Sequence, residues 1–459
     1  MLRKNDLLEL EIYDMTNLGF GVAKADGMVV FVSGAVIGDH ARVKIIKTSS
    51  SYAVGRIEEL IAPSPERTCE RCNNEKCQSC AYKLINYEKE LKMKHEDVVS
   101  CFKKAELPEL RILDVIPSPK LVGYRNKAQY PIAKTKDGKY VIGFYAPKTH
   151  RVTEARNCPL APTEFSKILD TLSTFFAKNN ISCYDEETGN GLLRHVYLRR
   201  GEVSRETMLV LVINGKTVPS LDKLSKILSN EHPEIKSFLL NINTDKTNVV
   251  LGKDYVNVFG DDHIRDTLCG VDLKLSAPSF YQVNHGAAEL LYKKARELAA
   301  PTKADTVLDL YCGVGSIGLS MADSCGELIG IEIVESAVKM ARDNAENAGF
   351  ANAKFYTGDA ADTEKLLENA ERDLGRKIDP SIIILDPPRS GCDEKLIRFT
   401  VGLDPKKIVY ISCNPQTLAR DMKIYSDLGY KSTEIQPIDL FPATGHVESV
   451  VCLKRTLGN

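Results

Sequence analysis

Apolar and polar residues follow three different patterns along the chain. Over residues 1–62, short runs alternate apolar and polar side chains and are separated by glycines, as at 8–12 and 41–46. Alternation of this kind is typical of half-buried strands. Five such runs predict a small all-β barrel, an architecture that often binds oligonucleotides. The Pro-Ser-Pro sequence at 63–65 predicts a linker, and we place the first domain boundary there.

The middle of the chain, residues 63–278, combines an amphipathic helix with strand-like runs. Residues 86–106 carry apolar side chains at helical spacing, and Asn86 is a suitable N-cap. Apolar, β-branched runs that predict strands follow at 141–145, 196–200, 208–213 and 238–242. We expect an antiparallel, RNA-binding sheet with helices between its strands. The helix at 86–106 could pack instead on the last part of the chain.

In residues 279–459, strand-like and helix-like segments alternate. Residues 285–300 have apolar positions at helical spacing. The predicted strands are at 306–311, 327–331, 354–356, 381–385, 407–411, 432–440 and 447–453. This order predicts an α/β fold with a doubly wound, Rossmann-like sheet, whose ligands bind at the carboxyl ends of the strands.

Composition and charge exclude some classes of protein. The 459 residues carry a net charge of −1, so there is no global signal for nucleic acid binding. We find no uninterrupted apolar run long enough to span a bilayer, and the N-terminus lacks the apolar core of a signal peptide. We therefore expect a cytoplasmic, monomeric protein that does not associate with membranes.

Charge is unevenly distributed, however. Residues 81–160 contain 16 Lys or Arg and 9 Asp or Glu. A local excess of positive charge can mark a surface that faces phosphates. A solvated surface that happens to be rich in lysine explains the same counts, and both interpretations remain open at this point.

Four of the thirteen cysteines lie close together, at Cys69, Cys72, Cys77 and Cys80. An odd number of cysteines in a long chain does not indicate a secreted disulfide framework. Two Cys-x-x-Cys pairs at this separation can surround one inorganic centre. Four thiolates suit Zn²⁺ or an iron–sulfur cluster, and spacing alone does not separate the two.

A glycine-rich turn predicts a nucleotide-like cofactor. Gly313, Gly315 and Gly318 follow the first strand of the predicted sheet, and Glu332 ends the next strand. The same pattern occurs in dinucleotide-binding enzymes and in enzymes that use S-adenosylmethionine (SAM).

Two further turns favour SAM. An Asp-Pro-Pro-Arg sequence begins at Asp386, after the strand at 381–385, and such acidic tetrapeptides are common in nucleic-acid methyltransferases. Asp359 follows the third strand of the sheet, where an adenine contact is usual.

The residues that could carry the chemistry are Cys413 and Glu448. Cys413 follows the strand at 407–411, and taken alone it is more easily explained as a buried structural thiol. Beside a SAM site, a thiol and a carboxylate together predict methylation of a pyrimidine at C5. The thiolate adds to C6, the resulting enolate takes the methyl group, and the carboxylate removes the C5 proton.

These motifs together resemble the RNA uracil-C5 methyltransferases of the TrmA/RumA type, along the whole chain. The resemblance implies that Cys413 is the nucleophile and Glu448 the base. The residues that it and the glycine motif assign to SAM are Gln282, Tyr311, Gly313, Gly315, Glu332, Asp359 and Asp386. Those expected to hold the target nucleotide are Phe280, Arg125, Asn126 and Lys127.

The N-terminal part also resembles elements of this family. The glycine turns at 19–21 and 34–39 resemble a TRAM domain, an RNA-binding barrel. The family's [4Fe-4S] site has the spacing Cys-x5-Cys-x2-Cys with a distant fourth cysteine. By resemblance the ligands are Cys72, Cys77, Cys80 and Cys158, although Cys72 is one residue closer than the family spacing. Cys69 could replace Cys72, and a zinc site formed by Cys69, Cys72, Cys77 and Cys80 remains the alternative.

The substrate implied by the resemblance is RNA. Relatives with a TRAM domain and a cluster mostly modify the large-subunit ribosomal RNA, so 23S ribosomal RNA is the first expectation and transfer RNA the second. A cytosine-C5 methyltransferase uses similar thiol chemistry but different motifs. A non-catalytic RNA-binding iron–sulfur protein conflicts with the presence of Cys413, Glu448 and Asp386.

Overall fold

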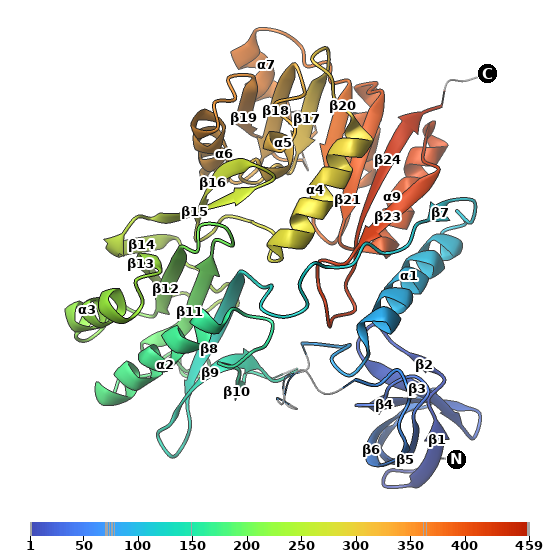
Figure 1. Cartoon of the computed structure of the whole chain (residues 1–459), viewed down its shortest axis with the longest axis vertical. Coiled ribbons are helices and arrows are strands. Elements are labelled where there is room, and N and C mark those ends of the chain that lie inside the picture. Colours follow the sequence, from blue (N-terminus) through green and yellow to red (C-terminus); the bar gives the residue numbers. More distant parts are fainter. Residues whose placement is uncertain are drawn as a thin grey trace.

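The computed structural model describes residues 2–456, except 69–71, 73, 75, 76, 78, 148, 361 and 364. Three large sheets and a two-stranded hairpin organise the chain, and Figure 1 shows the large sheets in different regions of the molecule. We call them the barrel, the central sheet and the C-terminal sheet, in chain order.

The barrel lies within residues 2–68, all of which are described, and its strands surround one apolar core. The strands are β1 (Leu7–Glu11), β2 (Asp14–Met15), β3 (Phe20–Ala25), β4 (Met28–Ser33), β5 (His40–Thr48) and β6 (Tyr52–Ala62). Val30, Val43 and Ile45 are fully buried in the core, because alternate residues of each strand point inward. The all-β prediction is confirmed. Of the glycine turn expected at 19–21, only Gly19 lies before β3, which begins at Phe20.

The central sheet has helices on one face. Its strands are β8 (Lys127–Lys134), β9 (Tyr140–Tyr145), β10 (Val152–Glu154), β11 (Leu193–Arg200), β12 (Thr207–Ile213), β13 (Ile235–Ile242) and β14 (Asp254–Gly260), in the order β10-β9-β8-β11-β12-β13-β14. Helices α2 (Thr163–Lys178) and α3 (Leu221–Glu231) supply part of its apolar core. The prediction of an antiparallel sheet is wrong for one pair. β12 and β13 are parallel, because α3 crosses over between them.

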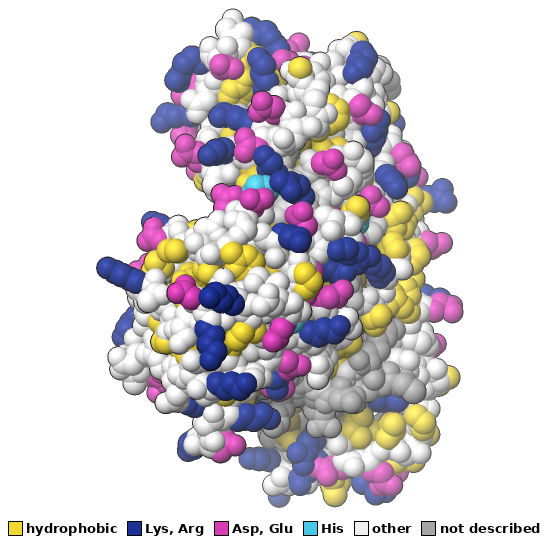
Figure 2. All heavy atoms as spheres, turned by 60° about the vertical axis from the view of Figure 1, so that its left-hand side comes forward, with side chains coloured by type: hydrophobic (Ala, Val, Ile, Leu, Met, Phe, Trp, Pro, Cys, Tyr) yellow, Lys and Arg dark blue, Asp and Glu magenta, His cyan; other side chains and the backbone are white. Residues whose placement is uncertain are grey.

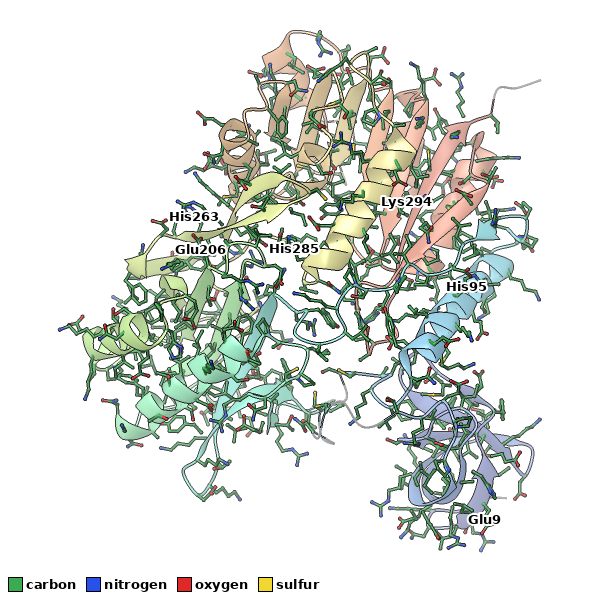
Figure 3. The ribbon with its side chains drawn as sticks, in the orientation of Figure 1. Glu9, His95, Glu206, His263, His285 and Lys294 are labelled. Atoms are coloured by element: carbon green, nitrogen blue, oxygen red, sulfur yellow. The ribbon has the colours of Figure 1, made fainter. Side chains whose placement is uncertain are left out.

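A separate hairpin follows the central sheet. β15 (His263–Leu268) and β16 (Val271–Ser276) pair only with each other in the described part of the chain. Ile264 and Leu273 are buried in the core of the C-terminal sheet. His285, labelled in Figure 3, lies 2.8 Å from the Thr267 carbonyl through Nε2 and so links the hairpin to the following helix.

The C-terminal sheet has the predicted doubly wound α/β fold. Its strands are β17 (Thr306–Leu310), β18 (Glu327–Glu332), β19 (Ala353–Thr357), β20 (Ile382–Leu385), β21 (Lys407–Ser412), β22 (Tyr430–Lys431), β23 (Glu434–Ile438) and β24 (Glu448–Arg455). They run in the order β19-β18-β17-β20-β21-β24-β23, with β24 antiparallel to both neighbours. The fully buried run Ile382–Leu385 is typical of a strand covered on both faces.

Two layers of helices cover this sheet. α4 (His285–Ala299), α5 (Ser316–Leu319) and α6 (Glu335–Asn347) contribute to the apolar core on one face. α7 (Glu368–Leu374), α8 (Glu394–Gly402) and α9 (Pro415–Asp427) contribute to the core on the other. In the described residues, no helix is both long and apolar enough to cross a membrane.

The second layer also contains a segment from the first quarter of the chain. α1 (Tyr87–Lys104) begins after Asn86, whose side chain accepts a hydrogen bond from the Lys89 amide, as the N-cap prediction requires. Phe102 of this helix is buried in the core of the C-terminal sheet. β7 (Arg111–Ile112) then pairs in parallel with β23. Nε2 of His95, labelled in Figure 3, lies 3.3 Å from the Ile112 carbonyl oxygen, so α1 contacts β7 directly.

A buried group of charges fastens α1 to the loop between β23 and β24. The ammonium of Lys94 donates to Glu90 Oε1 at 2.8 Å and to Asp439 Oδ1 at 2.7 Å, and all three side chains are inaccessible to solvent. Lys94 also donates to the Phe441 carbonyl at 3.1 Å. Burial raises the pKa of Glu90, whereas the charge of Lys94 lowers it. The loop therefore depends on a cation supplied by a residue 345 positions away.

We expect Lys94→Ala to lower the free energy of unfolding by about 3–5 kcal/mol, because Glu90 and Asp439 would remain buried without their cation. Urea denaturation followed by circular dichroism measures the change. Lys92→Ala is the matched control: Lys92 lies on the same helix and pairs with Glu88 in solvent, so its loss should leave the midpoint unchanged. Equal effects of the two substitutions would contradict the role of burial.

Candidate active site

Cys413 and Glu448 are brought together by the pairing of β21 with β24. The two strands are antiparallel, and Ser412 pairs with Ser449. Cys413 directly follows β21 and Glu448 begins β24, so they are the next residues beyond this pair. The Glu448 carboxylate is close enough for its charge to act on the Cys413 thiol. The structure therefore brings together two residues that are 35 positions apart in sequence (448 − 413).

Burial controls the protonation of both groups. Burial, and next the charge of Asp386, raise the pKa of Glu448 to about 8, while Arg389 opposes the shift. Burial and the charge of Glu448 raise the pKa of Cys413 to about 11, again opposed by Arg389. At neutral pH the thiol is therefore protonated, and Arg389 is a cation that favours the ionised form of both groups.

The turn that carries Cys413 is fixed on both sides. Asn414 caps α9 by accepting from the Gln416 amide at 3.1 Å, and Pro415 starts the helix. The Asn414 amide group also donates to the Arg389 carbonyl at 3.1 Å. This bond connects the Cys413 turn to the Asp386–Arg389 turn. Cys413 thus lies just before the N-terminus of a helix, where the helix dipole favours a thiolate.

The glycine-rich turn has the backbone geometry that its sequence predicted. Gly313 and Gly315 have positive φ values of 56° and 83°. A side chain at Gly315 would place its Cβ 2.9 Å from the ring of Phe355. The Gly313 amide donates to Glu332 Oε2 at 3.1 Å. The turn therefore holds the acidic residue of the next strand in a fixed orientation.

A cavity of about 190 Å³ opens at the carboxyl ends of β17, β18 and β19. Tyr311, Glu332 and Asp359 all line it, so three residues predicted to contact SAM lie together. Asp386 follows β20, the strand next to β17, and burial raises its pKa to about 7. The arrangement suits a ligand that lies across the ends of neighbouring strands.

Sequence reasoning missed one acidic residue of this site. Asp309 lies in β17 and is fully buried. Its Oδ2 accepts from the Gly318 amide at 3.0 Å, which ties the strand to the helix after the glycine turn. Burial, and to a smaller extent Asp386 and Glu332, raise its pKa to about 8. A lone acid within an apolar strand was the signal that could have identified it.

The residues predicted to hold the target nucleotide lie beside the segment that contains Gln282. The Asn126 side chain donates to the Gln282 carbonyl at 2.8 Å. Arg125 forms an isolated backbone bridge with Asn284. Phe280 leaves 60% of its surface exposed, unusual for a large apolar ring. Phe280, Arg125 and Asn126 are therefore neighbours along two adjacent backbone segments.

Lys127 differs from an ordinary surface lysine. It is the first residue of β8 and lies close enough to Arg199 and Arg125 to feel their charges. Burial, and next these two cations, lower the pKa of Lys127 to about 8. This cluster of cations provides a local positive potential although the chain as a whole is nearly neutral. Elsewhere, Lys and Arg are interspersed with Asp and Glu, as Figure 2 shows for one face.

The predicted cluster cysteines share one cavity. Cys72, Cys77, Cys80 and Cys158 all line a space of about 890 Å³, together with Arg125. Burial, followed by the charges of the other three thiols, raises the pKa of Cys80 to about 12. Cys69 lies outside the described residues. Among those that are described, no three or more His, Cys, Asp or Glu are arranged to hold a single metal ion.

The comparisons with known proteins agree with these features. A family model described as tRNA (Uracil-5-)-methyltransferase matches residues 86–456, and a TRAM domain model matches residues 4–57. An uncharacterized RNA methyltransferase of Clostridium acetobutylicum is 37% identical over 458 residues, covering 99% of this chain and 98% of its own. One of Listeria monocytogenes is 36% identical over 454 residues, with the same two coverages.

A solved structure shares the whole architecture. The tRNA (uracil-54, C5)-methyltransferase of Pyrococcus abyssi, in complex with S-adenosyl-L-homocysteine, is 28% identical and has a TM-score of 0.78. The match covers 97% of this chain and 99% of that one. The resemblance inferred from the motifs is confirmed. The chain is a SAM-dependent RNA methyltransferase with an N-terminal TRAM domain, and it belongs to the tRNA (uracil-5-)-methyltransferase family.

Proposed function

We propose that this enzyme methylates C5 of uridine in RNA through a covalent bond between Cys413 and C6 of the base. The observation that carries the proposal is the placement of Cys413 close to Glu448, at the end of the sheet that also holds the glycine turn. A nucleophile, a base and a cofactor cavity then converge on one edge of the fold.

The sequence of bond changes assigns one task to each side chain. The Cys413 sulfur forms a bond to C6 as its proton passes to solvent, and the electrons of the C5–C6 double bond move into an enolate that makes C5 nucleophilic. SAM, when bound, would supply the methyl group that C5 takes, with S-adenosyl-L-homocysteine as the other product. Glu448 then accepts the C5 proton, and the electrons of the C5–H bond re-form the C5–C6 double bond as the sulfur is expelled. This step regenerates Cys413 and releases the methylated base.

The pKa values set a condition on each group, because both are mainly protonated at neutral pH. A thiol with a pKa near 11 must lose its proton during the attack rather than before it. Glu448, with a pKa near 8, has to be ionised when the C5 proton is removed. Arg389 favours both ionised forms, so we propose that it supports the reaction from the Asp-Pro-Pro-Arg turn.

The remaining site residues keep the roles predicted from the sequence. We propose that SAM is held by residues from the strand ends and from the segment before α4, namely Gln282, Tyr311, Gly313, Gly315, Glu332, Asp359 and Asp386. Phe280 would stack on the target nucleotide, since its ring is exposed beside the site. The neighbouring cationic and amide groups of Arg125, Asn126 and Lys127 would contact its phosphate and base.

For the cysteine cavity we propose a [4Fe-4S] cluster held by Cys72, Cys77, Cys80 and Cys158. The support is that all four thiols line one space. Their spacing in the sequence is also close to that of the family's cluster. Zinc bound by Cys69, Cys72, Cys77 and Cys80 is the alternative.

We propose RNA of the large ribosomal subunit, 23S ribosomal RNA, as the substrate, on the resemblance of motifs and appended barrel. Transfer RNA is the second candidate, and one observation favours it: the Pyrococcus abyssi enzyme that matches this chain over 97% of its length is a tRNA (uracil-54, C5)-methyltransferase. The division into residues 1–62, 63–278 and 279–459, the monomeric state and the cytoplasmic location also remain predictions.

Glu448→Gln should allow methyl transfer but slow release by about 10²–10⁴-fold, because the amide does not take up the C5 proton. A protein–RNA adduct that survives denaturing electrophoresis would then accumulate. The matched controls are Cys413→Ala and the double variant, which should bind SAM but form neither adduct nor product. An adduct in either control would contradict the nucleophile, and rapid release by Glu448→Gln would contradict the base.

Deleting the gene should remove 5-methyluridine from specific positions of 23S ribosomal RNA. Reverse-transcription and mass-spectrometric mapping of ribosomal and transfer RNA from the deletion strain measures this. Loss confined to transfer RNA would select the second candidate. If both RNA classes keep all their 5-methyluridine, the proposed function is wrong.

Protein purified without oxygen should contain iron and acid-labile sulfide in equal amounts, with visible absorption. Cys72→Ser should lower the iron content. Cys183→Ser is the matched control, because this free cysteine of the central sheet does not line the cavity. Zinc without iron, or iron unaffected by Cys72→Ser, would contradict the proposed ligand set.

A further inference from the structure

We infer that a second cavity, on the central sheet, binds an unpaired nucleobase of the RNA substrate away from the methylated uridine. The inference rests on the proposed function, because it assigns an additional part of the same RNA. None of the residues predicted from the sequence to hold the target nucleotide, Phe280, Arg125, Asn126 and Lys127, lines this cavity.

The cavity measures about 920 Å³ and lies at one end of β9 and β11. Three loops complete its wall, with contributions from Arg151, Glu186 and Lys246. Figure 1 shows these strands in the part of the molecule that lies apart from the C-terminal sheet. A space of this size is more than sufficient for one base.

Two tyrosine rings on the wall are held in fixed orientations. The Tyr145 ring meets His150 and His195 edge to face, with centroids 5.7 and 6.4 Å apart. Its hydroxyl donates to Glu186 Oε1 at 3.0 Å. The Tyr184 ring lies 4.4 Å from the guanidinium carbon of Arg194. Rings that are already ordered lose little conformational entropy when a base stacks on them.

Arg194 holds the wall of the cavity in place, because its guanidinium group is bound by other parts of the protein. It is 95% buried, and its guanidinium donates to the carbonyls of Asn243, Asp245 and Thr247 at 2.7, 2.8 and 3.3 Å. These bonds fix the loop that carries Lys246. Arg194 therefore orders one tyrosine and one loop of the site at the same time.

His195 supplies a polar group without a partner. The ring is 92% buried, and in the described residues its Nδ1 is inaccessible to solvent and has no hydrogen-bond partner. Burial, with the nearby charge of Arg194, lowers its pKa to about 4, so the ring is neutral at physiological pH. The cavity wall at this position is therefore an uncharged aromatic ring.

The balance of charge favours a base over a phosphate. The lining carries three cations, Arg151, Arg194 and Lys246. It also carries three carboxylates, Asp185, Glu186 and Glu187. A phosphate site would need a net excess of positive charge. Aromatic rings beside both donors and acceptors match instead the flat faces and polar edges of an unpaired base.

The cavity adjoins the cysteine cavity, since Arg151 and Val152 line both spaces. Arg125 also lines the cysteine cavity, and its backbone pairs with Asn284, in the segment that contains Gln282 of the proposed SAM site. We expect one RNA strand to occupy both the active site and this cavity. Bases upstream or downstream of the target would then contribute to the choice of substrate.

The absence of tryptophan from the sequence permits a direct test. Tyr184→Trp would place the only indole of the chain on the cavity wall. Adding a short, randomised single-stranded oligoribonucleotide should quench its emission in a saturable manner, because the base stacks on the indole. Heparin, a polyanion without bases, should not. In a separate binding measurement, Tyr184→Ala should weaken oligoribonucleotide affinity by about 5- to 100-fold.

Phe399→Trp, on α8 of the C-terminal sheet, is the matched control and should not be quenched. Quenching by heparin, equal quenching of the control, or unchanged affinity of Tyr184→Ala would each overturn the inference. The emission measurement does not require methyl transfer and can be repeated with Cys413→Ala. Quenching without any methylation by the unmodified enzyme would therefore refute the proposed function but support this site. Methylation without quenching would support the proposed function but refute this site.

Discussion

The loop before Glu448 is held by an ammonium group that has no access to water. Removing a charge from water is costly, and the cost is recovered only when all its hydrogen bonds are made. Lys94 meets this condition with two carboxylates and a carbonyl. Around it, Asp439 accepts from the Tyr87 hydroxyl at 2.9 Å, and Glu90 accepts from the Ala443 amide at 2.7 Å. The position of the proposed base therefore depends on helix α1.

The same loop also depends on the barrel. The Tyr82 amide, in the segment after the barrel, donates to the Ala443 carbonyl at 2.9 Å. Gly445 lies so close to the turn between β2 and β3 that a Cβ there would stand 2.1 Å from the Asn17 carbonyl oxygen. Ala443 itself has a positive φ of 68°, a conformation that needs support from its surroundings. The barrel contacts the loop that precedes Glu448. RNA bound to the barrel can therefore influence the position of the proposed catalytic base.

Much of this architecture was predictable because it rests on local patterns. Apolar periodicity located the strands of the C-terminal sheet, and the motifs at Gly313, Asp386 and Cys413 lie at strand ends, where the sheet brings them together. The prediction was wrong for the parallel pair β12–β13, because strand direction depends on the crossover by α3 and not on the strands themselves.

What the sequence could not show are contacts between distant segments. Asp309 carries no motif of its own beyond one acid in an apolar strand. Lys94 looks like one more surface lysine of an amphipathic helix, the same as Lys92, until Asp439 is placed beside it. The cavity around Tyr145 and Tyr184 is formed by three loops, and none of them has a recognisable pattern in the chain.

Helix α1 packs on the C-terminal sheet and β7 joins its edge, and this arrangement has a consequence for synthesis of the chain. The ribosome produces residues 87–112 long before β23 and β24, so α1 and β7 must wait for partners that are made much later. A fragment that begins at residue 279 would lack the edge strand β7 and leave the face of α9 that contacts α1 uncovered. The loop before Glu448 can therefore take up its final position only when segments from both the early and the late part of the chain are present.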